Sequence, residues 1–132
     1  MSDQIKHECG IALIRLLKPL DFYQKKYGSK SYGVNKMYLM MEKQHNRGQD
    51  GAGIATVKIG AKPGQKYIHR ERSSGKQPIQ DVFSRVNERI QSSKENLNDN
   101  PFHGELLLGH VRYGTFGKNN IESVHPFLRQ NN

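Results

Sequence analysis

The stretch "GELLLGHVRYG", Gly104 to Gly114, joins the apolar run of a buried strand to polar side chains at its end. Because side chains alternate along a strand, His110 and Arg112 are predicted to share one face. The glycines of "GTFG", Gly114 to Gly117, predict a turn immediately afterwards. An arginine at this position could bind a carboxylate through two parallel hydrogen bonds, or could serve equally well as a structural salt-bridge partner.

Three other stretches have the pattern of strands. "CGIALIRLL", Cys9 to Leu17, is aliphatic enough to predict a second buried strand. "IATVKI", Ile54 to Ile59, alternates apolar and polar residues, and "KYIHRER", Lys66 to Arg72, can pair with it as a hairpin. The sheet is therefore predicted to contain at least one antiparallel pair.

Helical spacing predicts two helices. The first extends from about Val34 to His45 and has a sulfur-rich inner face. The second begins near Pro78, and its apolar stripe comprises Ile79, Val82, Phe83, Val86 and Ile90. "LDFYQKKYGSKSYG", Leu20 to Gly33, has no clean period and predicts a loop, and "SSKENLNDNP", Ser92 to Pro101, predicts a linker. This order favours an α+β fold with helices on a mainly antiparallel sheet.

Composition narrows the class of protein. A chain of 132 residues is long enough for one small domain or for part of a larger one. The net charge of +9 raises the alternative of a basic nucleic-acid-binding domain, but the basic residues are scattered and match no nucleic-acid-binding motif. No apolar run is long enough for a membrane helix and no secretory signal is present, so a cytoplasmic location is expected. The six histidines have no metal-ligand spacing, so no metal site is expected.

The single cysteine, Cys9, is the first candidate for chemistry. It could be a small buried residue at the start of a strand. Alternatively, "MSDQIKHE", Met1 to Glu8, is a leader that is removed, which makes Cys9 the N-terminal residue. A free α-amine has a pKa of about 7.7 to 8.0, so the amine could act as a base for the thiol of the same residue.

The second candidate is "NRGQDGAGIA", Asn46 to Ala55. Its glycines allow the backbone to turn tightly and to approach a ligand closely. Arg47 and Asp50 could pair and fix the shape of the loop. An ordinary turn between a helix and a strand would have the same composition.

Taken together and in this order, four segments resemble the class II glutamine amidotransferases of the N-terminal-nucleophile type, and within them the amidophosphoribosyltransferase branch. The segments are "CGI" (Cys9 to Ile11), "RGQDGAGIAT" (Arg47 to Thr56), "GHVRYGTFG" (Gly109 to Gly117) and "HPF" (His125 to Phe127). The resemblance implies a leader at 1–8, and at 9–132 the N-terminal portion of a glutamine amidotransferase domain, which is the front part of an αββα sandwich.

The resemblance also implies roles for individual residues. Cys9 would attack the side-chain amide of glutamine, form a thioester and release ammonia. Arg112 would bind the α-carboxylate of glutamine, and Arg47 would line its pocket. Tyr113 and Thr115 would help to hold the substrate. This segment itself is expected to need no cofactor.

The parent reaction implied by the resemblance transfers the amide nitrogen of glutamine to phosphoribosyl pyrophosphate in purine synthesis. The phosphoribosyltransferase domain of the parent would be a partner and would use Mg²⁺, and a homo-oligomer is expected. The 132-residue chain alone is expected to be inactive, because the family's oxyanion-stabilising segment would lie downstream. The alternative is a glutamine-binding or regulatory module without turnover.

Overall fold

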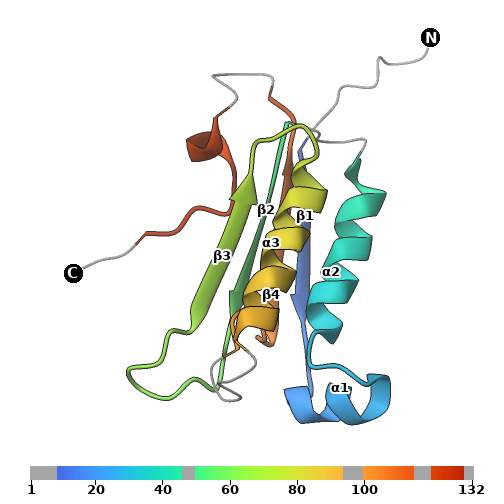
Figure 1. Ribbon diagram of the computed structural model, residues 1–132, viewed down its shortest axis with the longest axis vertical. Coiled ribbons are helices and arrows are strands. Elements are labelled where there is room, and N and C mark those ends of the chain that lie inside the picture. Colours follow the sequence, from blue (N-terminus) through green and yellow to red (C-terminus); the bar gives the residue numbers. More distant parts are fainter. Residues whose placement is uncertain (1–8, 46–49, 94–99, 115–119, 130–132) are drawn as a thin grey trace.

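A computed structural model describes residues 9–45, 50–93, 100–114 and 120–129. It contains one four-stranded sheet in the order β1-β4-β2-β3, in which every neighbouring pair is antiparallel (Figure 1). The strands are β1 (Gly10–Arg15), β2 (Gly51–Val57), β3 (Ile68–Ser73) and β4 (Leu106–Arg112). The helices are α1 (Leu20–Tyr27), α2 (Tyr32–Lys43) and α3 (Pro78–Ser92), and a short 3-10 turn, η2, spans Ile121–Ser123. The predicted α+β class is confirmed.

Helices α2 and α3 pack side by side on one face of the sheet and bury its apolar side chains. From the central strand β4, Leu107 and Val111 point into this core and are almost fully buried. Met37 and Met41 of α2 are buried, and their sulfur atoms pack against β4 at Gly109. The predicted sulfur-rich inner face is therefore confirmed. The apolar stripe of α3 is also confirmed, and Pro78 lies in the first turn of that helix.

The interpretation of Leu20–Gly33 as a loop was wrong, because α1 occupies most of it. The helix is short, and Tyr23 is its only buried residue, so its sequence shows no clear period. Its ends carry the signals of a helix instead: Asp21 lies in the first turn, and Gly28 ends the helix with a φ of 82°. Tyr23 also stacks on Tyr32 of α2, with ring centroids 5.0 Å apart, which anchors α1 to the next helix.

The prediction that Cys9 to Leu17 forms a buried strand also needs correction. Strand β1 lies at an edge of the sheet, and only alternate side chains face the helices. Ile11 and Leu13 point to the opposite face, where they are 69% and 63% exposed. The aliphatic run therefore predicted a strand correctly. It did not show that, within the described residues, one face of this strand is exposed.

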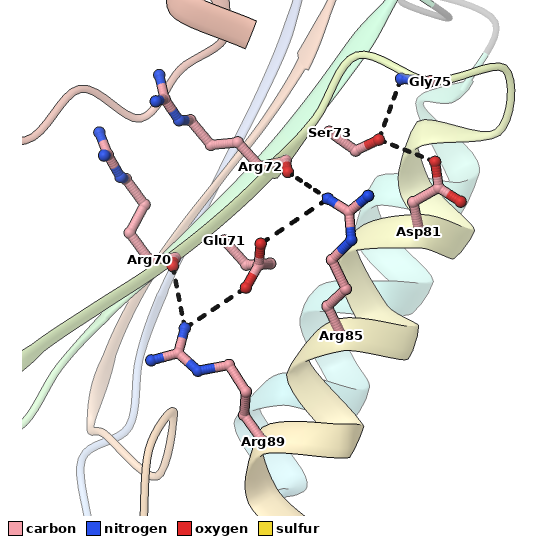
Figure 2. A network of polar contacts seen from close by, with 8 residues as sticks. All are labelled: Arg70, Glu71, Arg72, Ser73, Gly75, Asp81, Arg85 and Arg89. Atoms are coloured by element: carbon pink, nitrogen blue, oxygen red, sulfur yellow. Dashed lines mark hydrogen bonds and ion pairs between the residues drawn. The ribbon is translucent and has the colours of Figure 1, made fainter.

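The opposite edge strand, β3, is held by side chains of α3 (Figure 2). Arg85 donates a hydrogen bond of 2.9 Å to the backbone carbonyl of Arg72, and Arg89 donates one of 3.3 Å to the carbonyl of Arg70. The carboxylate of Glu71 lies between the two helix arginines, 3.9 Å from Arg85 and 3.4 Å from Arg89. These contacts satisfy backbone groups of an edge strand and leave them less able to pair with another chain.

A segment from Val124 to Leu128 crosses the face of the sheet that lies away from the helices. Arg72 donates a hydrogen bond of 2.9 Å to the carbonyl of Val124, and Arg70 donates one of 3.3 Å to the carbonyl of Pro126. Gly53 of β2 lies directly beneath, and a Cβ atom there would overlap the carbonyl oxygen of His125. The glycine therefore allows this segment to lie against the sheet.

We expect Gly53→Ala to push the segment away from β2 and to lower the free energy of unfolding by about 1 to 3 kcal/mol, the range for overpacking. Urea denaturation measures the change. Gly60→Ala is the matched control, because a Cβ atom at Gly60 meets nothing within 4 Å. Equal stability of the two variants would show that the segment does not lie against β2.

Candidate functional site

The pairing of β1 with β4 brings Cys9 to the end of the "GHVRYG" strand. Gly10 lies opposite Val111 in the register, so the residue before β1 meets the residues after β4. The backbone N–H of Tyr113 donates a hydrogen bond to Cys9 Sγ at 3.3 Å. Cys9 is exposed, so its interpretation as a buried packing residue is wrong. A thiol at the open end of a sheet is accessible to a substrate.

Asp50, which directly precedes β2, lies at the same end of the sheet as Cys9. The carboxylate of Asp50 accepts a hydrogen bond of 2.7 Å from the N–H of Gly114, and the N–H of Asp50 donates one of 3.0 Å to the carbonyl of Arg112. These two bonds tie the glycine-rich segment to the turn that follows β4. The predicted partner of Asp50, Arg47, lies outside the described residues, as does Thr115.

Arg112 lies on the face of the sheet away from the helices and is only 7% exposed. Its guanidinium lies close to Gly114, because a Cβ atom on that glycine would be 3.6 Å from Arg112 Nη1. The guanidinium of Arg112 thus lies near Gly114, the residue after Tyr113, whose backbone contacts Cys9. The prediction that His110 and Arg112 share a face is confirmed, since both stand opposite glycines of β2, Gly53 and Gly51.

A depression of about 580 Å³ opens beside Cys9. Two histidines line it: the ring of His110 lies 4.6 Å from that of His125, which lies 4.0 Å from the ring of Phe127. From the sequence, the histidines were evaluated only as metal ligands, and neither of these two was assigned to the site. The "HPF" segment could have placed His125 there, and the "GHVRYG" segment could have placed His110 there.

The pKa of His110 is lowered from 6.5 to about 4, first by burial and then by electrostatic repulsion from His125 and Arg112. His110 is therefore neutral near pH 7. A neutral imidazole adds no charge to the depression, whereas Arg112 provides a fixed positive charge near His110, as its effect on the pKa of His110 shows. This arrangement suits a ligand that has a negative end and an uncharged polar group.

The low pKa of His110 gives a prediction for stability. Between pH 6.5 and about 4 the unfolded chain binds more protons than the folded chain at this residue, so stability is retained above this window and falls as the pH is lowered through it. Urea denaturation at several pH values should show this loss, and His110→Gln should reduce its slope. His45→Gln, at an exposed histidine, is the control, and equal slopes in both variants would contradict the assignment.

Two other expectations from the sequence concerned a metal site and a membrane-spanning helix. Among residues 9–45, 50–93, 100–114 and 120–129, no group of three His, Cys, Asp or Glu side chains is placed to hold a metal ion. Within the same ranges no helix is both long and apolar enough to cross a membrane.

Comparison with curated proteins then identifies relatives of this chain. It is 32% identical over 127 residues to amidophosphoribosyltransferase 2, chloroplastic, of Arabidopsis thaliana, a match that covers 96% of this chain and 17% of the relative. It is 34% identical over 95 residues to the amidophosphoribosyltransferase of Methanocaldococcus jannaschii, covering 72% of this chain and 16% of that protein. This chain is a homologue of part of the amidophosphoribosyltransferases.

A glutamine–fructose-6-phosphate aminotransferase of Bradyrhizobium diazoefficiens is also similar, at 28% identity over 80 residues that cover 61% of this chain and 10% of the relative. The chain thus spans about one sixth of the length of the amidophosphoribosyltransferases it matches. No family model matches the sequence, and no solved structure matches it significantly.

Proposed function

We propose that this chain supplies the glutamine-hydrolysing part of an amidophosphoribosyltransferase. The observation that carries the proposal is the exposed thiol of Cys9 in contact with the backbone of Tyr113, beside the turn that holds Arg112. A thiol that borders a depression, with an arginine at the same end of the sheet, supports the proposal. The names of the relatives supply the chemical class, since they include an amidophosphoribosyltransferase and a glutamine-dependent aminotransferase.

In the proposed reaction Met1 to Glu8 are removed and the α-amine of Cys9 acts as the base. The amine takes the proton of the thiol, and the sulfur attacks the amide carbon of glutamine. The carbon–nitrogen bond then breaks, and the proton passes to the departing nitrogen, which leaves as ammonia. Water attacks the resulting thioester and releases glutamate, which restores the thiol.

The family resemblance assigns substrate contacts to four residues. Arg112 would bind the α-carboxylate of glutamine through its planar guanidinium, which fixes the charged end of the substrate while its amide points at the sulfur. Tyr113 would contribute its backbone, which already touches Cys9. Arg47 and Thr115 are assigned to the same pocket as part of the proposal.

The open face of the sheet supports the proposed αββα sandwich. Helices cover one face, whereas Ile11, Leu13 and Phe127 remain exposed on the other. Apolar side chains gathered on one face of a sheet are the pattern expected where a second sheet packs. We therefore propose that the intact protein places its second sheet on this face.

The proposed parent reaction transfers the amide nitrogen to phosphoribosyl pyrophosphate and yields phosphoribosylamine, glutamate and pyrophosphate. A phosphoribosyltransferase domain would carry out the transfer with Mg²⁺, and the ammonia released at Cys9 would be its second substrate. A cytoplasmic homo-oligomer is part of the same proposal.

Two measurements on the intact protein test the proposal. Glutamine should raise the melting temperature, and purified protein should release ammonia from glutamine. Stabilisation without ammonia release would identify a glutamine-binding module instead of an enzyme. A protein that responds to single-stranded DNA or RNA but not to glutamine would overturn the proposal in favour of a nucleic-acid-binding domain.

A further inference from the structure

A second, polar cleft of about 240 Å³ lies at the end of the sheet opposite Cys9. Its walls come from the segment after α1, the hairpin that follows β2 and the turn that precedes β4. The proposed glutamine reaction uses none of its residues. The side chains that matter here are Lys30, Lys58, Asn100, His103 and Glu105.

Two buried polar atoms of residues that line this cleft, Asn100 Oδ1 and His103 Nδ1, have no hydrogen-bond partner among the residues that the structure describes. The other ring nitrogen of His103 lies 2.8 Å from the hydroxyl of Ser31. Buried polar atoms are almost always hydrogen-bonded, so two unpartnered atoms beside one cleft indicate that a small polar ligand or water completes the site.

The charges around the cleft show which ligand would suit it. Lys30 and Lys58 provide two ammonium groups, and Glu105 is the one carboxylate among the described lining residues. The carboxylate of Glu105 accepts a hydrogen bond of 2.9 Å from the N–H of Ile59. Lys30 also reaches Asp21 at 3.4 Å, but Asp21 is largely exposed to solvent, which weakens that pair. Among the lining residues that the structure describes, two ammonium groups therefore stand against one carboxylate.

The pKa of His103 also reflects the positive charge of the two lysines. Its pKa is lowered from 6.5 to about 4, first by burial and then by the charges of Lys58 and Lys30. The imidazole is therefore neutral near pH 7. When the hydroxyl of Ser31 donates to Nε2, Nδ1 carries the ring proton and can donate to a ligand. The amide of Asn100 can likewise present its NH₂ group after a half-turn about its last bond.

We propose that this cleft binds a phosphate group of a small metabolite. Lys30 and Lys58 would contact the phosphate oxygens as cations, and His103 and Asn100 would donate hydrogen bonds to them. The cleft has room for a phosphate and a small attached group. The proposal does not depend on the glutamine reaction, because the two sites lie at opposite ends of the strands.

Titration with inorganic phosphate, followed by NMR, tests this site. Phosphate should shift the signals of Ile59, Gly60 and His103 in a saturable way and should raise the pKa of His103, since a nearby anion favours the imidazolium. The double variant Lys30→Gln/Lys58→Gln should weaken binding by about tenfold or more, the loss of one charge-assisted hydrogen bond. Preserved chemical-shift dispersion elsewhere would show that the variant is folded.

Lys62→Gln/Lys66→Gln is the matched control, because it removes the same charge at two lysines of the hairpin after β2 that do not line the cleft. It should leave phosphate binding unchanged. Equal weakening in both double variants, or no saturable shift with phosphate, would overturn the proposal. A nucleoside monophosphate and a short single-stranded oligonucleotide separate the two sources of phosphate. Binding of the oligonucleotide alone would contradict a metabolite site, whereas binding of the monophosphate would support it.

Discussion

Cys9→Ser should reduce glutamine-dependent ammonia release by the intact enzyme about a thousandfold or more, the scale on which loss of a catalytic nucleophile acts. A serine hydroxyl has almost the size of the thiol but ionises far less readily, so the attack on the amide is lost. Synthesis from added ammonia should continue, because that reaction bypasses the thioester. Comparison of the two rates with the same preparation measures the effect.

The structure makes this substitution informative. Cys9 is exposed, and within the described residues its sulfur forms hydrogen bonds to backbone atoms of Tyr113, so serine should disturb the fold little. Equal loss of the glutamine-dependent and ammonia-dependent rates would assign Cys9 to folding. Unchanged glutamine hydrolysis would remove the nucleophile from the account.

Arg112→Lys should raise the Michaelis constant for glutamine by about 10- to 150-fold, which corresponds to about 1.5 to 3 kcal/mol for a hydrogen bond to a charged group. Lysine keeps the charge but cannot offer two parallel N–H groups to a carboxylate. Ammonia-dependent synthesis does not use this contact and should be unchanged. Steady-state kinetics with glutamine and with ammonia measure both quantities.

Arg15→Lys is the control for this variant, since Arg15 lies at the other end of β1 and is exposed. Arg112 is almost fully buried, so thermal unfolding must be measured alongside the kinetics. A large fall in melting temperature with an unchanged Michaelis constant would assign Arg112 to structure.

The sequence predicted the elements whose burial follows a regular period. Helix α3 carries an apolar stripe, so its hydrophobic residues showed both the type of element and its buried face. Strand β2 was also predicted, but its first four residues are all buried and the polar Thr56 is buried too, so alternation did not show its buried face. Helix α1 was missed because its stability comes from its ends and from tyrosine stacking, which involves residues of the next helix. Such contacts leave no period in the sequence.

The site was predictable in its parts but not in its geometry. Cys9 and Tyr113 are 104 residues apart, and their contact depends on the register of β1 against β4. Alternation along β4 did predict the face of Arg112. Its burial and the ring contact of His110 with His125 depend on a segment that crosses the sheet, which no local pattern shows.

The central claim is that Cys9 is the nucleophile of a glutamine site that includes Arg112. Labelling of the intact protein with an electrophilic analogue of glutamine, such as a diazoketone or chloroketone, tests it most directly, with peptide mass spectrometry to locate the adduct. We expect a single adduct on Cys9, protection by glutamine and much slower labelling in Arg112→Lys, while iodoacetamide labels both proteins at similar rates. Labelling that glutamine does not slow, or an adduct elsewhere while Cys9 stays unmodified, would contradict the account.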